Sequence, residues 1–352
     1  MRDVVPIIIP CLDPRENFFE LLVELQSLKQ PIIIINDGSS EKCDYIFDKA
    51  KEIIANNKLN KIISYPINKG KGFALKAGFR YVIENIPHAI GVVTIDCDGQ
   101  HKLKDIKKVI KSLQQNPETI ILGVRDFDLD EIPIKSKLGN KITKYVLSHF
   151  LNIKLKDTQT GLRGISIKYI SEIQNIKYNR FEFETEMIIK FYQHIKEVNI
   201  ETVYDSATNH STHFNPIKDS LSIYYVIFRQ FFKYIISSIS SFFLDVGLFY
   251  VFSIILKNII PFTYVFISTY MARIISAVFN YILNKHIVFQ AKESRNTFIK
   301  YCILCFAQAS ISGILVAVSL YFTANIIVSK IVIDSLLFIL SYFVQKRYIF
   351  TK

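Results

Sequence analysis

The sequence predicts an α/β domain with a parallel sheet, followed by an all-helical membrane domain of four helices. In the first half, short β-branched runs alternate with amphipathic stretches, which is typical of a parallel α/β sheet. In the last third, four apolar stretches are each about as long as a helix that crosses a bilayer. Four such stretches are too many to bury in a domain of this size.

Strands and helices are expected in strict alternation up to Gly123. The expected strands are Val4–Ile9, Ile32–Ile35, Ile62–Tyr65, Ile90–Ile95 and Thr119–Gly123. The expected helices are Asn17–Lys29, Cys43–Asn56, Gly72–Asn85 and Leu103–Gln115. Ligands of such sheets bind beyond the carboxyl ends of the strands. The motifs described below for the first 125 residues all lie at such ends.

The membrane spans are expected at Phe231–Leu256, Phe262–Leu283, Tyr301–Phe322 and Ile326–Gln345. Basic residues gather in the middle connection and in the tail: Lys285, Lys292, Arg295, Lys300, Lys346, Arg347 and Lys352. The opposite connections hold only Lys257. The positive-inside rule therefore predicts an integral membrane protein whose N-terminal domain and C-terminus are cytoplasmic.

The membrane part contains an internal repeat. The segment Asn280–Phe289 resembles Ser341–Phe350, and Phe231–Tyr234 resembles Phe298–Tyr301. Each unit is thus a two-span hairpin, which predicts parallel rather than inverted repeats. Charged residues fall within or near the spans, where they are expected to form pairs, with a lipid-phosphate contact of Arg273 as the alternative. They are Asp245, Arg273, Lys330 and Asp334.

Three regions follow: residues 1–215 as a cytoplasmic domain, 216–230 as an amphipathic helix at the membrane surface, and 231–352 as the membrane domain. A plain linker helix is the alternative for 216–230. The net charge of +12 predicts an anionic partner, either phosphate-bearing substrates or the lipid bilayer. Nucleic acid is disfavoured because no basic stripe is interleaved with aromatic residues. Cys302 and Cys305 lie in an apolar run and are expected to pack.

The strongest local motif is Asp96-Cys97-Asp98-Gly99-Gln100-His101, directly after an apolar run. Side chains alternate along a strand, so the two aspartates point the same way. Their carboxylates repel unless a cation lies between them, and Mg²⁺ or Mn²⁺ prefers such oxygen ligands. The alternative is a solvated turn, since Asp-Gly pairs form turns.

Three further polar motifs follow earlier strands. The first is Pro10-Cys-Leu-Asp13-Pro-Arg-Glu16, and the second is Asn36-Asp37-Gly-Ser-Ser. The third, Asn68-Lys-Gly-Lys71-Gly72, precedes a helix, where small residues and lysines suit a diphosphate. The second motif is equally a good strand-to-helix connection with Ser as the N-cap.

In this order and spacing the four motifs resemble the family 2 glycosyltransferases, in particular the dolichyl-phosphate mannose synthase and polyprenyl-phosphate glucosyltransferase branch. The likeness continues through Gly123–Arg125, Asp157–Gly164, Phe181–Glu186 and Ser211–Phe214. The last third resembles GtrA-like membrane domains. The resemblance covers nearly the whole chain and implies a GT-A-like, Rossmann-type mixed sheet and the plasma membrane of a prokaryote.

The resemblance also implies roles residue by residue. Asp96, Asp98 and Gln100 would hold Mg²⁺ or Mn²⁺ on a nucleotide-sugar diphosphate. The donor would be bound by Pro10, Asp13, Glu16, Asn36, Asp37, Lys71, Asp96, Cys97 and Asp98. The acceptor phosphate would meet Arg125, Lys135, Lys137 and Arg163. Asp157, Asp98 and Arg125 would serve catalysis. The chain departs from the family at Asp13-Pro14, where Asn-Glu is usual, and at Asn36, where aspartate is usual.

The expected reaction is inverting transfer of one sugar from a UDP- or GDP-sugar to undecaprenyl or dolichyl phosphate at the cytoplasmic face. Its product would serve cell-envelope polysaccharide or glycoprotein modification. A lipid phosphate is already ionised near pH 7, so neither His101 nor His213 is needed as a base. The alternative is a flippase of lipid-linked sugar with a regulatory soluble domain. A processive synthase is disfavoured because the chain has no tryptophan. The sugar and the oligomeric state are not predicted.

Overall fold

The computed structural model describes residues 3–125, 134–201, 218–291, 296–319 and 326–350. The side chains of residues 134–137 and 326–327 lie outside this described part. The chain divides into two compact units, residues 1–227 and 228–352. Each unit is described by itself.

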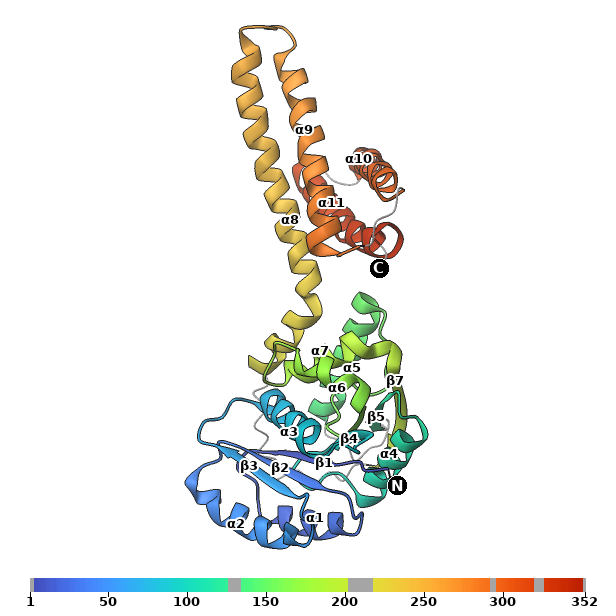
Figure 1. The fold of residues 1–352 in the computed structure, drawn as a ribbon. Helices are drawn as coiled ribbons and strands as arrows, with labels where there is room; N and C mark the ends of the chain where they lie inside the picture. Colours follow the sequence, from blue (N-terminus) through green and yellow to red (C-terminus); the bar gives the residue numbers. More distant parts are fainter. Residues whose placement is uncertain (1–2, 126–133, 202–217, 292–295, 320–325, 351–352) are drawn as a thin grey trace. The chain divides into compact units, whose positions relative to one another are not determined.

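The first unit is built on a seven-stranded sheet with the order β3-β2-β1-β4-β6-β5-β7 (Figure 1). Its strands are β1 (Ile7–Cys11), β2 (Ile32–Asp37), β3 (Lys61–Tyr65), β4 (Gly91–Thr94), β5 (Ile120–Arg125), β6 (Arg163–Ser166) and β7 (Ile195–Ile200). All five strands expected from β-branched runs are present. β6 and β7 were not expected from those runs.

The sheet is not parallel throughout. β6 runs antiparallel to both of its neighbours, β4 and β5, while β7 is parallel to β5. The sheet is therefore mixed, as the family resemblance implied. With only four residues, Arg-Gly-Ile-Ser, β6 lacks the apolar run by which the other strands are recognised.

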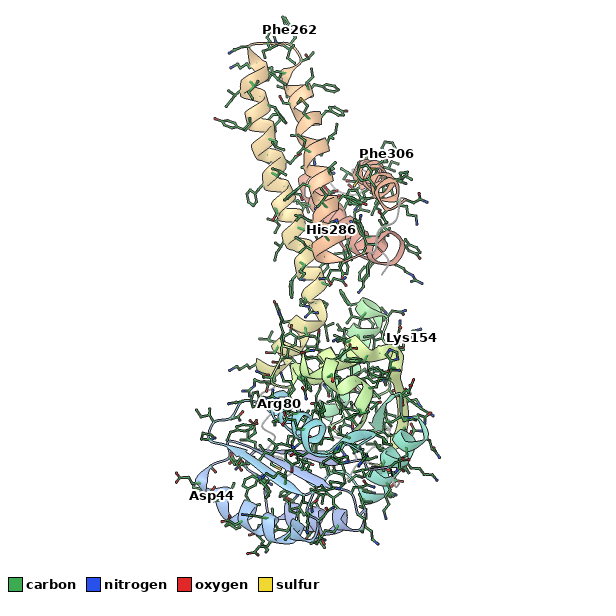
Figure 2. All side chains as sticks on the ribbon, viewed as in Figure 1. Asp44, Arg80, Lys154, Phe262, His286 and Phe306 are labelled. Atoms are coloured by element: carbon green, nitrogen blue, oxygen red, sulfur yellow. The ribbon has the colours of Figure 1, made fainter. Side chains whose placement is uncertain are left out.

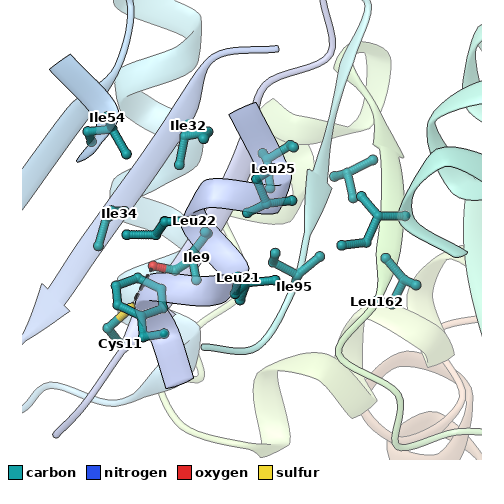
Figure 3. Packing of buried hydrophobic residues seen from close by; sticks show 14 of the residues in the cluster. Ile9, Cys11, Leu21, Leu22, Leu25, Ile32, Ile34, Ile54, Ile95 and Leu162 are labelled. Atoms are coloured by element: carbon teal, nitrogen blue, oxygen red, sulfur yellow. Dashed lines mark hydrogen bonds between the residues drawn. The ribbon is translucent and has the colours of Figure 1, made fainter. Parts of the chain in front are cut away.

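Helices cover both faces of the sheet. α1 (Asn17–Gln26), α2 (Asp44–Ile53) and α4 (Leu103–Gln115) pack with Ile7 and Ile9 on one face, part of which is drawn in Figure 3. α3 (Lys71–Asn85), α6 (Ile167–Gln174) and α7 (Glu182–Phe191) pack with Ile8 on the other. Alternate strand residues thus fill opposite cores. α5 (Ile134–Leu151) and three short 3₁₀ turns (Glu41–Cys43, Ile54–Asn56, Tyr192–His194) complete the described elements.

One continuous helix, α8 (Lys218–Lys257), runs through the segment expected to form a separate surface helix and into the first span. There is no break at residue 230. Ile223 and Ile227 are buried in an apolar cluster with Leu122 and Leu147 of the first unit. The apolar side chains of this segment that we assigned to the membrane surface therefore pack in part on the protein itself, while Leu221 is 66% exposed.

Four helices are long and apolar enough to cross a membrane within the described residues, as the sequence predicted. They are α8, α9 (Tyr264–Leu283), α10 (Thr297–Ser319) and α11 (Ile326–Val344). Large apolar side chains point outward from this unit: Phe262 is 99% and Phe306 is 78% exposed (Figure 2). In water such a surface would be costly, so the protein is a membrane protein.

The internal repeat has a matching internal geometry. Both hairpins end in a π-helical turn, Asn284–Val288 and Gln345–Ile349. Equivalent contacts recur with the hairpins exchanged. The Tyr281 and Phe298 rings lie 5.0 Å apart at 77°, and their counterparts Tyr342 and Phe231 lie 4.9 Å apart at 77°.

The hydrogen bonds also recur at equivalent positions of the two hairpins. Asn280 Nδ2 donates to Ser241 Oγ at 3.0 Å, and at the equivalent positions Ser341 Oγ donates to Gln308 Oε1 at 3.1 Å. At the centre, Asn284 Nδ2 donates to Gln345 Oε1 at 3.0 Å. The two hairpins are therefore related by a pseudo-two-fold axis that passes near this amide pair.

The charged residues of the spans form pairs. Arg273 Nη2 lies 3.4 Å from Asp245 Oδ2, and Lys330 Nζ lies 3.0 Å from Asp334 Oδ2. Pairing of this kind offsets part of the cost of charges in a bilayer.

Candidate active site

The predicted motifs meet at one edge of the sheet. β1, β2, β3 and β4 are parallel, so Cys11, Asp37, Tyr65 and Thr94 mark the carboxyl edge. β6 is antiparallel to β4, so its first residue, Arg163, and the loop before it reach the same edge. The order of the strands reverses direction between β1 and β4, which is where open α/β sheets bind ligands.

The Asp96–His101 loop follows β4 at this edge. Gln100 N donates to Asp98 Oδ1 at 3.0 Å, and Asn17 Nδ2 donates to the Asp98 carbonyl at 2.7 Å. Gly99 has φ +76°, a left-handed conformation that glycine adopts without steric cost. The loop thus has a defined shape. The Asp98 side chain stays exposed at its surface, whereas 32% of the Asp96 side chain is exposed.

Asp96 has two cationic or potentially cationic neighbours. Lys71 Nζ lies 2.8 Å from Asp96 Oδ1, and His101 Nε2 lies 3.4 Å from Asp96 Oδ2. Burial alone would raise the pKa of Asp96, but Lys71 and His101 outweigh burial and hold that pKa well below its usual range. Although part of its surface is exposed, desolvation by the surrounding protein and the charge of Asp96 raise the pKa of Asp98. His101 is buried against Asp96 and therefore supports the loop.

The first two polar motifs hold neighbouring loops together. Asp37 accepts hydrogen bonds from the backbone N–H groups of Lys69 and Gly70, both at 2.9 Å, so it fixes the loop that presents Lys71. Asp13 Oδ1 accepts from the Ser40 N–H and hydroxyl at 2.8 and 2.9 Å. The departure from the family at Asp13 thus coincides with a tie between the ends of β1 and β2.

The remaining donor-side candidates lie around these ties. Asn36 Oδ1 accepts from the Ser39 N–H at 2.9 Å. Glu16 is exposed and accepts from the Tyr45 hydroxyl at 3.3 Å. Pro10 is buried in β1, and Cys97 packs half-buried on the apolar cluster that contains Cys11.

The acceptor-side candidates Arg125 and Asp157 form one tight pair. Arg125 Nε donates to Asp157 Oδ2 at 2.6 Å, and Arg125 Nη2 donates to Asp157 Oδ1 at 3.2 Å. Asp157 is fully buried, while 15% of the Arg125 side chain is exposed. This geometry is the bidentate pairing that orients a guanidinium, and Asp157 therefore positions Arg125.

One loop connects this pair to the Asp96 loop. It runs from Asp157 to Arg163, and its Gly161 carbonyl accepts from Thr94 Oγ1 at 2.9 Å. A Cβ at Gly161 would lie 2.1 Å from Asp96 Oδ2, so glycine alone leaves room for the Asp96 carboxylate. The two halves of the candidate site are therefore in direct contact.

Arg163 is placed differently from its expected role. It is 1% exposed, and its Nε and Nη1 donate to the carbonyls of Thr160 and Glu184 at 2.9 and 3.1 Å. The structure thus directs Arg163 inward to Glu184 rather than towards an acceptor. The Glu184 side chain is 10% exposed, and its Oε2 lies 3.1 Å from Lys71 Nζ. We did not predict a role for Glu184, although its Phe181–Glu186 segment belongs to the motifs that resemble the family.

Some candidates lie outside the described residues. The side chains of Lys135 and Lys137 belong to this group, as do His213 and the whole Ser211–Phe214 segment. Their roles stay predictions.

The residues present fit a divalent cation that shares its ligands with a substrate. Among the residues that the structure describes, no three His, Cys, Asp or Glu side chains group closely enough to hold a metal. Asp96, Asp98 and Gln100 offer hard oxygen ligands on one loop, and the absence of a side chain at Gly161 leaves room for the Asp96 carboxylate. Asp98 and Gln100 also line a cavity of about 410 Å³ between α1 and the start of α4, although Asp96 and Lys71 do not line this cavity.

Comparison with known proteins agrees with this arrangement. Residues 7–174 match Glycosyl transferase family 2, and residues 233–350 match the GtrA/DPMS transmembrane domain. An uncharacterised protein, MJ1222 of Methanocaldococcus jannaschii, is 28% identical over 58% of this chain and 83% of its own length.

Two of the relatives are named as dolichyl-phosphate sugar transferases. The UDP-N-acetylglucosamine–dolichyl-phosphate N-acetylglucosaminyltransferase of Methanococcus voltae is 29% identical over 57% of this chain and 86% of its own. The dolichyl-phosphate beta-glucosyltransferase ALG5A of Trichomonas vaginalis is 31% identical over 43% and 46%, respectively. The chain is therefore a glycosyltransferase that joins a family 2 domain to a transmembrane domain of the GtrA/DPMS family.

Proposed function

We propose that the protein transfers one sugar from a nucleotide-diphosphate sugar to a polyprenyl phosphate at the cytoplasmic membrane face, with inversion at the anomeric carbon. One observation carries the proposal. The Asp96–His101 loop and the Arg125–Asp157 pair lie on loops that touch at Gly161, in a chain with four membrane-crossing helices. Carboxylates for a metal-bound diphosphate and a guanidinium for a second phosphate thus lie at one edge of the sheet, linked by the loop from Asp157 to Arg163.

In this reaction the lipid phosphate is the nucleophile. One of its oxygens forms a bond to the anomeric carbon while the bond from that carbon to the nucleoside diphosphate breaks. A single displacement of this kind inverts the configuration and gives a lipid phosphodiester. The phosphate is already ionised near pH 7, so no protein base is required and positioning is the main task.

The residues divide this task. Arg125, oriented by buried Asp157, would hold the acceptor phosphate through charge-assisted hydrogen bonds. Asp96, Asp98 and Gln100 would hold Mg²⁺ or Mn²⁺, which when bound neutralises the leaving diphosphate. Lys71, at the start of α3, would face the same diphosphate. Asp37 would keep the Lys71 loop in place through its two backbone hydrogen bonds.

A panel of donors tests the proposal. Purified full-length protein is incubated with Mn²⁺, undecaprenyl or dolichyl phosphate, and labelled UDP- and GDP-sugars, and label in the organic phase is counted. UDP-sugars come first, because the Methanococcus voltae relative is named for a UDP-sugar. We expect transfer from one donor and none with Asp98→Ala, which stays in the membrane fraction. Absence of transfer from every donor contradicts the proposal.

A further inference from the structure

Four charged side chains beside the Asp96 loop form an alternating chain of charges. Asp96 lies against Lys71 at 2.8 Å, and Lys71 lies against Glu184 at 3.1 Å. Glu184 in turn lies 3.5 Å from Arg163 through its other oxygen. Two carboxylates and two cations alternate, so the net charge of these four side chains is zero.

The inner end of this chain is fixed by burial. Arg163 is 1% exposed, and an arginine stays charged at any physiological pH. Arg163 Nη2 and Glu184 Oε1 have no hydrogen-bond partner among the described residues, so each depends on the other's charge. The Glu184 carboxylate is the side chain that compensates this buried guanidinium. The Glu184 carboxylate therefore lies between the Arg163 guanidinium and the Lys71 ammonium.

Lys71 consequently occupies the position of a counter-ion for Asp96. Its side chain is 18% exposed, and it approaches the carboxylate that the metal would require. A divalent cation entering alone would meet this ammonium at close range, where like charges repel strongly. A diphosphate arriving with the cation offers the ammonium a new partner.

We infer that Lys71, held by Glu184, is an internal counter-ion of Asp96 that couples the binding of metal to the binding of nucleotide. When both ligands bind, the metal replaces Lys71 as the partner of Asp96, and the diphosphate replaces Asp96 as the partner of Lys71. The inference rests on the proposed function, because it assumes a metal-bound nucleoside diphosphate. Coupling between two ligands is reciprocal and typically amounts to about 5- to 150-fold in affinity. Glu184 is a positioning residue in this scheme.

Lys69 provides a matched control in the same loop. Its Nζ lies 5.4 Å from the centre of the Tyr65 ring and 4.7 Å from that of Phe73, and it makes no described ion pair with Asp96. Lys69→Met and Lys71→Met thus remove the same charge two residues apart. Only Lys71→Met removes a positive charge that contacts Asp96.

The test measures Mn²⁺ binding to the full-length protein in detergent, by the loss of the free-ion electron paramagnetic resonance signal. Mn²⁺ is titrated alone and then with UDP or GDP. We expect Lys71→Met to bind Mn²⁺ alone at least about tenfold more tightly than the parent protein. Lys69→Met should match the parent. The nucleotide should tighten Mn²⁺ binding to the parent, and this coupling should shrink in Lys71→Met.

The outcomes separate the two claims. If Lys71→Met binds Mn²⁺ alone with parental or weaker affinity while a nucleotide still tightens binding, the counter-ion inference is wrong and the proposed function survives. If no protein binds Mn²⁺ even with UDP and GDP, both are overturned. Thermal unfolding of each variant establishes that affinities are compared between folded proteins.

Discussion

Adding a single methyl group at Gly161 should lower the rate of sugar transfer strongly while changing the stability of the fold only slightly. A Cβ in Gly161→Ala would lie 2.1 Å from Asp96 Oδ2. An ordinary contact between carbon and oxygen is about 3.3 Å. The Asp96 carboxylate must therefore retreat by about 1.2 Å, the difference between the two, and give up its 2.8 Å contact with Lys71.

The expected cost falls on the reaction. Misplacing a reacting group by about 1 Å lowers the rate about 100-fold, or about 2.7 kcal/mol of transition-state stabilisation. The fold loses only a partly exposed ion pair, which is worth about 1 kcal/mol or less. We therefore expect kcat/KM for sugar transfer to fall about 100-fold, with a small change in the free energy of unfolding.

Gly139→Ala is the matched control for this variant. A Cβ at Gly139, in α5, would meet nothing nearer than Gln159 Nε2 at 4.0 Å. It should leave kcat/KM unchanged and stabilise the helix slightly. Transfer kinetics and thermal unfolding are measured for both variants. If Gly161→Ala keeps at least a third of the parental kcat/KM, Asp96 does not have the role assigned to it.

Three further predictions concern other contacts. Arg125→Met leaves the buried Asp157 carboxylate without its cationic partner, so the free energy of unfolding should fall by about 3–5 kcal/mol. Asp157→Asn should lower the free energy of unfolding by less. Chemical denaturation measures both changes. Asp98→Asn removes one carboxylate ligand at an exposed position, so it should abolish transfer while leaving the melting temperature within a few degrees of the parent. Asn284→Leu and Gln345→Leu each break the amide pair at the pseudo-two-fold axis, and a double-mutant cycle in detergent should give a coupling of about 0.6 kcal/mol; zero coupling would contradict that contact.

The sequence allowed prediction of those strands and helices whose length and hydropathy are set by their immediate surroundings. The five β-branched strands and the four spans were predicted because strand cores and bilayer thickness impose length and hydropathy on their sequences. β6 was missed because four residues with an arginine at the start carry no such pattern. The packing of the segment expected to form a surface helix did not follow from its sequence, because an amphipathic face looks the same whether it packs on lipid or, as Ile223 does, on protein.

The candidate site divides in the same way. The position of Asp96 and Asp98 at a strand end followed from the alternation of strands and helices. The contacts that define their environment did not, since Lys71 and Gly161 reach Asp96 from separate elements, and Glu184 reaches Lys71 from α7. No spacing in the sequence brings these residues together. Arg163 showed the limit most clearly, because a basic residue in an acceptor motif proved to be buried against Glu184.

Metal-dependent transfer of a labelled sugar to polyprenyl phosphate tests the central claim most directly. Full-length protein, one responsive nucleotide sugar and undecaprenyl or dolichyl phosphate are combined with Mn²⁺ or with a chelator. Our account predicts a lipid-linked sugar phosphate of inverted anomeric configuration, formed with Mn²⁺ and lost on chelation. Transfer that is equally fast after chelation, or a product of retained configuration, would contradict it.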